Sequence, residues 1–131
     1  MTGLHHVQLA IPEGGEEPAR RFWVDALGLV EVAKPPDLAG RGGCWFRSHD
    51  AVGAVTLEIH LGVETPFVPA RKAHPALVVD DLDATARRLR RGGYDVDERE
   101  RTTFAGFLRL HTHDPHGNRV EVLAPEGGLP S

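Results

Sequence analysis

The sequence is poor in several features that would each point to a particular class of protein. It contains one cysteine, Cys44, so an internal disulfide and a thiolate-rich zinc site are both excluded. No apolar run approaches the ~20 residues that a membrane-spanning helix needs, and the N-terminus lacks the basic and apolar segments of a secretory signal. We therefore expect a cytoplasmic protein with no membrane partner.

Positive charge and aromatic side chains are scarce as well. The 15 Lys and Arg residues are outnumbered by 19 Asp and Glu residues, which gives a net charge of −4, whereas a nucleic-acid-binding face is strongly basic. Aromatic residues make up only 6% of the chain, which leaves few of them to line a binding cleft. The expected partner is a small molecule or another protein. The residue in excess is histidine, with eight in 131 residues.

The length suits one domain, 1–131, and the order of predicted elements divides it into two similar halves. Residues 4–11 alternate between polar and apolar and predict a strand, and residues 18–27 have the spacing of an amphipathic helix that ends at Gly28. Three further strands are predicted at 29–33, 43–47 and 52–61. The first module, about residues 3–62, is therefore β-α-β-β-β.

A linker of about residues 63–72 leads to a second module, about residues 73–125, in which the same order returns. Residues 74–79 predict a strand, and Asp80 and Asp81 begin a helix that stops at Gly92 and Gly93. Strands are predicted at 94–98, 105–111 and 118–123. The fold class is α+β, with two tandem βαβββ modules.

The repeat also aligns individual residues that can bind a metal. His6 opens the first strand of one module and His74 that of the other, while Glu58 and Glu121 lie in the two last strands. Strand alternation points these side chains away from the helices, together with His60. Imidazole and carboxylate without thiolate suit zinc, iron(II), nickel or manganese. Glu58 and His60 lie two residues apart on one strand face, and which of them binds the metal stays open.

Four further histidines are not expected to bind the metal. Alternation places His5 on the helix side of its strand, where we expect a packed or exposed structural residue. His111, His113 and His116 crowd the last turn, and we expect solvated loop residues there.

Four motifs, quoted as they stand, resemble the vicinal oxygen chelate superfamily, which includes glyoxalase I, bleomycin resistance proteins and extradiol dioxygenases: LHHVQLAI, RRFWVDALGLVEV, AHPALVVDDLDATARRL and HDPHGNRVEVLAP. The resemblance implies curled mixed sheets around a cleft and metal ligands from the first and last strand of each module. Carried over, the ligands are His6, His74 and Glu121, with Glu58 or His60 in fourth place. Glu58 and Glu121 are the candidate catalytic residues.

The resemblance implies a divalent-metal-dependent lyase, isomerase or dioxygenase whose small oxygenated substrate is chelated by the metal, and it implies a homodimer. The alternative is a metal-free protein that binds or sequesters a small molecule, as bleomycin resistance proteins do. Such proteins tend to have an aromatic-lined cleft and to lack the histidine set, so the composition favours the enzyme.

Overall fold

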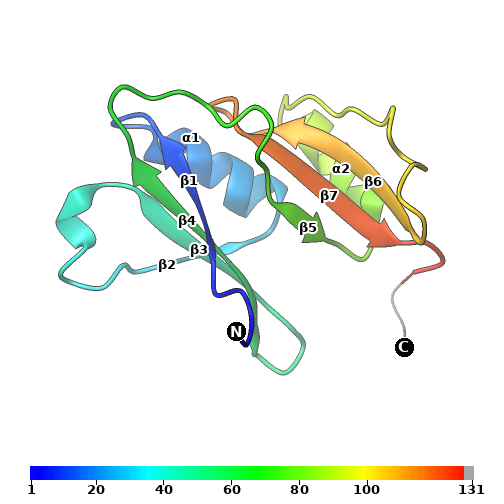
Figure 1. Ribbon diagram of the computed structural model, residues 1–131, viewed down its shortest axis with the longest axis horizontal. Helices are drawn as coiled ribbons and strands as arrows, with labels where there is room; N and C mark the ends of the chain where they lie inside the picture. Colours follow the sequence, from blue (N-terminus) through cyan, green and yellow to red (C-terminus); the bar gives the residue numbers. More distant parts are fainter. Residues whose placement is uncertain (129–131) are drawn as a thin grey trace. The chain divides into compact units, whose positions relative to one another are not determined.

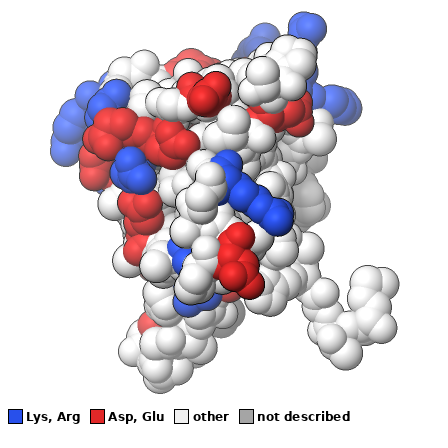
Figure 2. Space-filling view, turned by 90° about the vertical axis from the view of Figure 1, so that its left-hand side faces the viewer, with Lys and Arg blue, Asp and Glu red and all other residues white. Residues whose placement is uncertain are grey.

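The computed structural model describes residues 1–128, and its contacts group into two compact units, Met1–Pro69 and a second unit that begins at Ala70. Each unit contains one mixed sheet and a helical segment (Figure 1). Within residues 1–128 no helix is both long and apolar enough to cross a membrane. On the face drawn in Figure 2, acidic and basic side chains are interspersed, and no continuous basic surface is visible there.

Unit 1 follows the predicted β-α-β-β-β order. Its strands are β1 (Val7–Ile11), β2 (Val30–Val32), β3 (Cys44–His49) and β4 (Val55–Val63), in the sheet order β1-β4-β3-β2. β1 is parallel to β4 and the other pairs are antiparallel. The helix α1 (Glu16–Arg20) continues into a π-helical segment, η1 (Arg21–Ala26), and a short 3-10 helix, η2 (Ala39–Arg41), precedes β3.

The core of unit 1 forms where the helical segment meets one face of the sheet. Phe22 and Trp23 are fully buried, as the apolar spacing of residues 18–27 predicts. Phe46 and Ile59, which are paired neighbours on β3 and β4, are also fully buried. The residues that alternate with these along the strands, including Glu58 and His60, point to the opposite face of the sheet.

Unit 2 has a three-stranded sheet in the order β5-β7-β6, made of β5 (Ala76–Val78), β6 (Phe107–His113) and β7 (Arg119–Pro125). The helix α2 (Leu82–Arg91) begins at the predicted cap, where the Asp81 carboxylate accepts a hydrogen bond from the Ala84 N–H at 3.0 Å. α2 contacts β6 and β7, and its buried Leu89 belongs to the same core as Leu110 and Val122.

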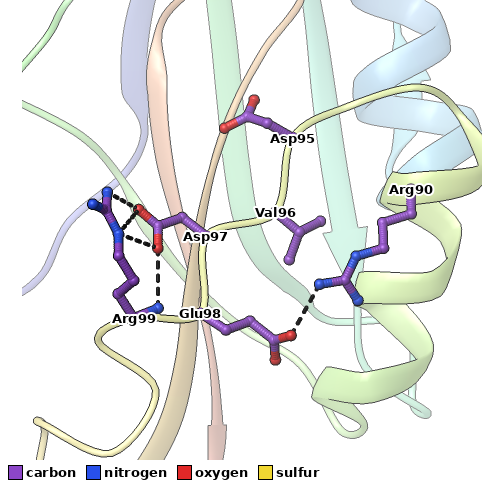
Figure 3. A pocket seen from close by; sticks show the side chains of 6 residues that line it. All are labelled: Arg90, Asp95, Val96, Asp97, Glu98 and Arg99. Carbon is purple, nitrogen blue, oxygen red and sulfur yellow. Dashed lines mark hydrogen bonds and ion pairs between the residues drawn. The ribbon is translucent and has the colours of Figure 1, made fainter.

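The prediction of a strand at residues 94–98 is wrong. This segment makes only an isolated bridge between Asp97 and His111. The Asp97 carboxylate accepts a hydrogen bond from the Arg99 N–H two residues on, and this turn ends the extended pairing. Of the charged groups around the hollow in Figure 3, Asp97 pairs with Arg99 and Glu98 with Arg90, while Asp95 pairs with His113. The hollow therefore offers little unpaired charge to a ligand.

Candidate metal centre

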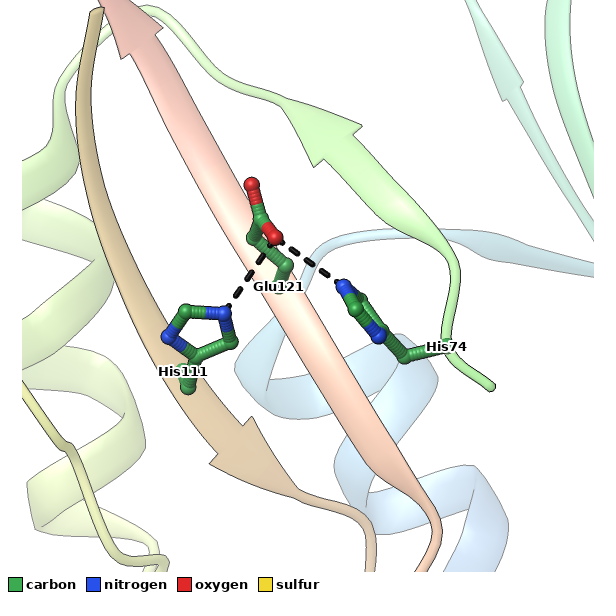
Figure 4. A group of neighbouring side chains, drawn as sticks. All are labelled: His74, His111 and Glu121. Atoms are coloured by element: carbon green, nitrogen blue, oxygen red, sulfur yellow. Dashed lines mark hydrogen bonds and ion pairs between the residues drawn. The ribbon is translucent and has the colours of Figure 1, made fainter. Parts of the chain in front are cut away.

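Two histidines and one glutamate of unit 2 meet on one face of its sheet (Figure 4). Glu121 lies on β7 directly opposite His111 on β6, and His74 comes just before β5 on the other side of β7. Oε1 of Glu121 is 3.0 Å from Nε2 of His74 and 3.2 Å from Nε2 of His111. One ligand atom from each of the three residues lies within 4.8 Å of the others, and His111 and Glu121 are buried.

The segment that carries His74 is fastened to β7 by backbone hydrogen bonds. The Arg119 N–H donates to the Ala70 carbonyl and the Glu121 N–H donates to the Pro75 carbonyl, both at 3.0 Å. The side chain of Asn118 adds a third bond, because its Oδ1 accepts from the Ala70 N–H at 3.0 Å. The segment is thus fixed on both sides of His74.

Asn118 is itself held by the turn between β6 and β7. Its side-chain amide donates to Asp114 at 3.0 Å, and its backbone N–H donates to the same carboxylate at 2.9 Å. Both residues are buried. The sequence motif DPHGN marked this turn but did not reveal that Asn118 reaches across to the segment before His74.

The hydrogen bonding of His74 determines what its second nitrogen can do. Nδ1 lies 2.8 Å from the carbonyl oxygen of Lys72, which only accepts, so Nδ1 carries a proton. A neutral imidazole would then turn the lone pair of Nε2 toward the carboxylate of Glu121. The contact therefore needs either a proton or a metal ion between the two atoms.

Glu121 lies among groups that keep it ionised. Burial opposes its charge, but the hydrogen bond from His74 and the positive charge of Arg109 outweigh burial and lower the pKa of Glu121. Nη1 of Arg109 lies 3.4 and 3.5 Å from the two carboxylate oxygens. Glu121 is therefore a carboxylate at neutral pH, which is the form that binds a metal.

His111 is not the solvated loop residue that its position near a turn predicted. It lies inside β6 with 6% of its surface exposed, and burial, followed by the charge of Arg119, lowers its pKa. The neutral ring is therefore available as a ligand. Counting back from a three-residue loop at residues 115–117, with Asp114 opposite Asn118, would have placed His111 opposite Glu121. His113, two residues on, is exposed as expected and bonds Asp95.

The predicted ligands of unit 1 also lie near one another. The His60 ring is stacked between Trp45, at 3.7 Å between ring centroids, and His6, at 4.0 Å. Nε2 of His60 is 3.0 Å from the Glu58 carboxylate, which also faces the Arg47 guanidinium at 3.4 Å. The hydrogen bond with His60 is the main cause that lowers the pKa of Glu58, while burial lowers the pKa of His60.

His5 departs from the prediction that it faces the helix. β1 begins at Val7, so strand alternation does not yet apply to His5 and His6. Nδ1 of His5 lies 3.0 Å from Nδ1 of His6, and Nε2 of His5 lies 3.8 Å from Glu58. Within residues 1–128, however, three ligand atoms converge only at His74, His111 and Glu121.

Comparison with protein families identifies the fold. Residues 3–122 match the Glyoxalase/Bleomycin resistance protein/Dioxygenase superfamily. The chain belongs to this superfamily. The resemblance carried by the four sequence motifs is thereby confirmed, as is the α+β fold class. None of the curated proteins gives a significant match.

Solved structures agree with this assignment. A glyoxalase family protein from Bacillus anthracis is 38% identical, with 96% of this chain and 97% of that chain covered and a TM-score of 0.85. The fold is shared with TnmS3, an antibiotic-binding protein from a Streptomyces species, at 24% identity, coverage of 96% and 99%, and a TM-score of 0.67. A glyoxalase/dioxygenase from Nostoc punctiforme has 18% identity, coverage of 95% and 92%, and a TM-score of 0.72.

Proposed function

We propose that the protein is a divalent-metal-dependent enzyme, a lyase, isomerase or dioxygenase, that acts on a small oxygenated substrate. The observation that carries the proposal is the His74 ring, whose Nδ1 proton is committed to Lys72 while Nε2 faces the Glu121 carboxylate. This is the usual arrangement of a metal-binding histidine, whose other nitrogen donates to a carbonyl that fixes the ring.

The donor set fits a divalent ion. Ligand atoms bonded at about 2.0–2.2 Å at tetrahedral or right angles lie about 2.8–3.6 Å apart. The distances from Glu121 to His74 and His111 are 3.0 and 3.2 Å. Two imidazoles and one carboxylate suit zinc, iron(II), nickel or manganese, and they leave coordination positions for a substrate.

A bound metal would act as a Lewis acid that polarises a substrate oxygen and stabilises negative charge on it. The protein's own residues prepare this site. The Lys72 carbonyl fixes the orientation of His74, and the Asn118 side chain holds the start of its segment. Arg109 keeps Glu121 ionised. Glu121 then serves as a ligand or, through a free carboxylate oxygen, takes up a proton from the substrate.

His6 and one of Glu58 or His60 remain proposed ligands on the resemblance to the superfamily, which implies ligands from both modules. Their packing supports a functional role, since Glu58 and His60 are buried polar residues that bond each other. Where His60 is the ligand, Glu58, ionised by its neighbours, is the proposed catalytic base. We further propose that the protein is a homodimer. Sedimentation velocity would measure its oligomeric state in solution.

Metal titration of the chelator-treated protein tests the proposal. Calorimetry with zinc and with manganese should show one ion bound per chain by the wild type. Glu121→Gln and His74→Gln should each weaken binding by at least about tenfold, because loss of one ligand from a three-residue set costs several kcal/mol. Glu126→Gln, which alters an exposed glutamate of the same unit, should bind as the wild type does. A wild type that binds neither ion would overturn the metal centre.

A metal-free binding protein is the second candidate. It is favoured by the same contacts, since His74 and Arg109 both contact the Glu121 carboxylate in the absence of a metal. The shared fold with the antibiotic-binding TnmS3 is compatible with this reading. In that case neither ion binds, and the wild type and Glu121→Gln behave alike in the titration.

A further inference from the structure

The paired strand residues around the candidate metal centre include more basic than acidic side chains. On β6 the residues Arg109, His111 and His113 point to one face, because they alternate along the strand. Their directly opposite partners on β7 are Leu123, Glu121 and Arg119. Glu121 is thus the single carboxylate among these six side chains, against two guanidinium groups. A divalent cation held by His74, His111 and Glu121 would make this face more positive still.

Arg109 is fixed in place next to the centre by the segment that precedes β6. Its Nη2 donates to the Thr103 hydroxyl at 2.7 Å and its Nε donates to the Glu100 carbonyl at 3.2 Å. The guanidinium also lies over the Phe104 ring, 5.6 Å from the ring centroid. Only 19% of the side chain is exposed. A guanidinium held in this way can receive an anion without first being ordered.

The edge of Arg109 that faces the centre is only weakly engaged. Nη1 lies 3.4 and 3.5 Å from the Glu121 oxygens, whereas a charge-assisted hydrogen bond is about 2.7–2.9 Å long. The other carboxylate near the guanidinium belongs to Glu100, 3.8 Å from Nη2 and half exposed, so solvent screens it. Nη1 can therefore still donate a hydrogen bond to a third oxygen atom, that of a bound ligand.

We propose that Arg109 binds substrate, and that the substrate carries a carboxylate or similar oxyanion beside the oxygen atoms that approach His74, His111 and Glu121. This inference rests on the proposed metal centre. The substrate class is then an anionic one, such as a 2-hydroxy or 2-oxo acid, whose anionic group forms charge-assisted hydrogen bonds with the guanidinium.

Calorimetric titration of the zinc-loaded protein with lactate and lactamide tests the proposal. Both probes offer a hydroxyl and an adjacent carbonyl oxygen, but lactamide has a neutral amide nitrogen in place of the second carboxylate oxygen, so only lactate carries a negative charge. The zinc ion itself favours lactate over lactamide in the wild type and in every variant. The test therefore compares how much each substitution changes the affinity for each of the two probes. Arg109→Gln should weaken lactate binding about tenfold and change lactamide binding less than about twofold, since a hydrogen bond between charged groups contributes about 1.5–3 kcal/mol. Arg87→Gln removes an equal charge from the exposed face of α2 and should leave both affinities unchanged.

The outcomes separate this inference from the metal centre on which it rests. If Arg109→Gln weakens both probes equally, or neither, Arg109 is no anion site and the inference fails while the metal centre stands. If the wild type takes up no zinc, both fail. Should Arg109→Gln not fold, Arg109→Lys keeps the charge but loses the planar fork, and it must still weaken lactate more than lactamide.

Discussion

Oε1 of Glu121 lies 3.0 Å from Nε2 of His74, and 3.2 Å from Nε2 of His111 on the opposite strand. Of these two histidines, His74 could be found from the sequence repeat and His111 could not. We expect His111→Gln to weaken zinc binding at least tenfold, because it removes one of three ligands. The stabilisation that zinc gives the wild type, about 2.7 kcal/mol at a free concentration of 100 times Kd, should fall to about 1.4 kcal/mol or less.

Chemical denaturation with and without zinc, at a fixed free zinc concentration, measures this effect. His113→Gln is the matched control, because His113 follows on the same face of β6 but is exposed and bonds Asp95. It should keep the full zinc-dependent increment. Equal increments in all three proteins would remove His111 from the ligand set.

Asn118 should act as a positioning residue for His74. Its Oδ1 is the side-chain anchor of Ala70, four residues before His74, and it is almost fully buried. Asn118→Ser leaves the Ala70 N–H without this partner, and we expect the free energy of unfolding to fall by about 1–3 kcal/mol. Zinc affinity should fall about tenfold as well, since a loosened segment must be ordered when the metal binds.

A second buried hydrogen bond distinguishes positioning from general destabilisation. The hydroxyl of Thr85, buried in α2, donates to the Asp81 carbonyl at 3.1 Å. Thr85→Val should lower stability by a similar amount and leave zinc affinity as it is in the wild type. If both variants lose affinity in proportion to their loss of stability, Asn118 has no special role in placing His74.

The sequence predicted most of what depends on local patterning. Strand alternation and helix spacing located the elements of unit 1 and the α2 cap, and the repeat aligned His74 with His6 and Glu121 with Glu58. The failures arise where side-chain contacts override the pattern. Asp97 turns the chain by bonding Arg99, so the strand at 94–98 is lost. His5 precedes β1, so the period of two cannot orient it. The contacts of Arg109 come from the neighbouring strand and the 100–104 segment, which no local pattern shows.

The stability of the metal-free protein should fall as the pH drops from 7.5 to 5. Burial lowers the pKa of His60 below the value of about 6.5 that it has in the unfolded chain. The unfolded state therefore binds more protons in this window, and the free energy of unfolding decreases as the pH falls, by at most about 1.4 kcal/mol per pH unit for one group. The groups facing His60 are Glu58, His5 and His6, and Glu58 stays ionised throughout, since its own pKa is lowered.

Urea denaturation across this range, in the presence of a chelator, measures the slope. His60→Gln should make it shallower, whereas His49→Gln, at an exposed position at the end of β3, should not. The slope will not vanish, because burial lowers the pKa of His111 as well. An unchanged slope in His60→Gln would mean that His60 is not held in the neutral form.

Two glycines of unit 1 test how tightly β3 and β4 approach each other. Gly43 has φ +82° and Gly14 has φ +76°, so alanine is strained by a similar amount at either position, about 1–2 kcal/mol. A Cβ on Gly43 would also lie 1.9 Å from the carbonyl oxygen of Leu61 on β4, while nothing lies within 4 Å of a Cβ on Gly14.

Because the Leu61 oxygen belongs to the backbone, the clash at Gly43 can be relieved only if β3 and β4 move apart next to Cys44, where β3 begins. We therefore expect Gly14→Ala to cost only the backbone strain and Gly43→Ala at least about 3 kcal/mol, measured by urea denaturation. Equal costs would show that the sheet opens there without resistance.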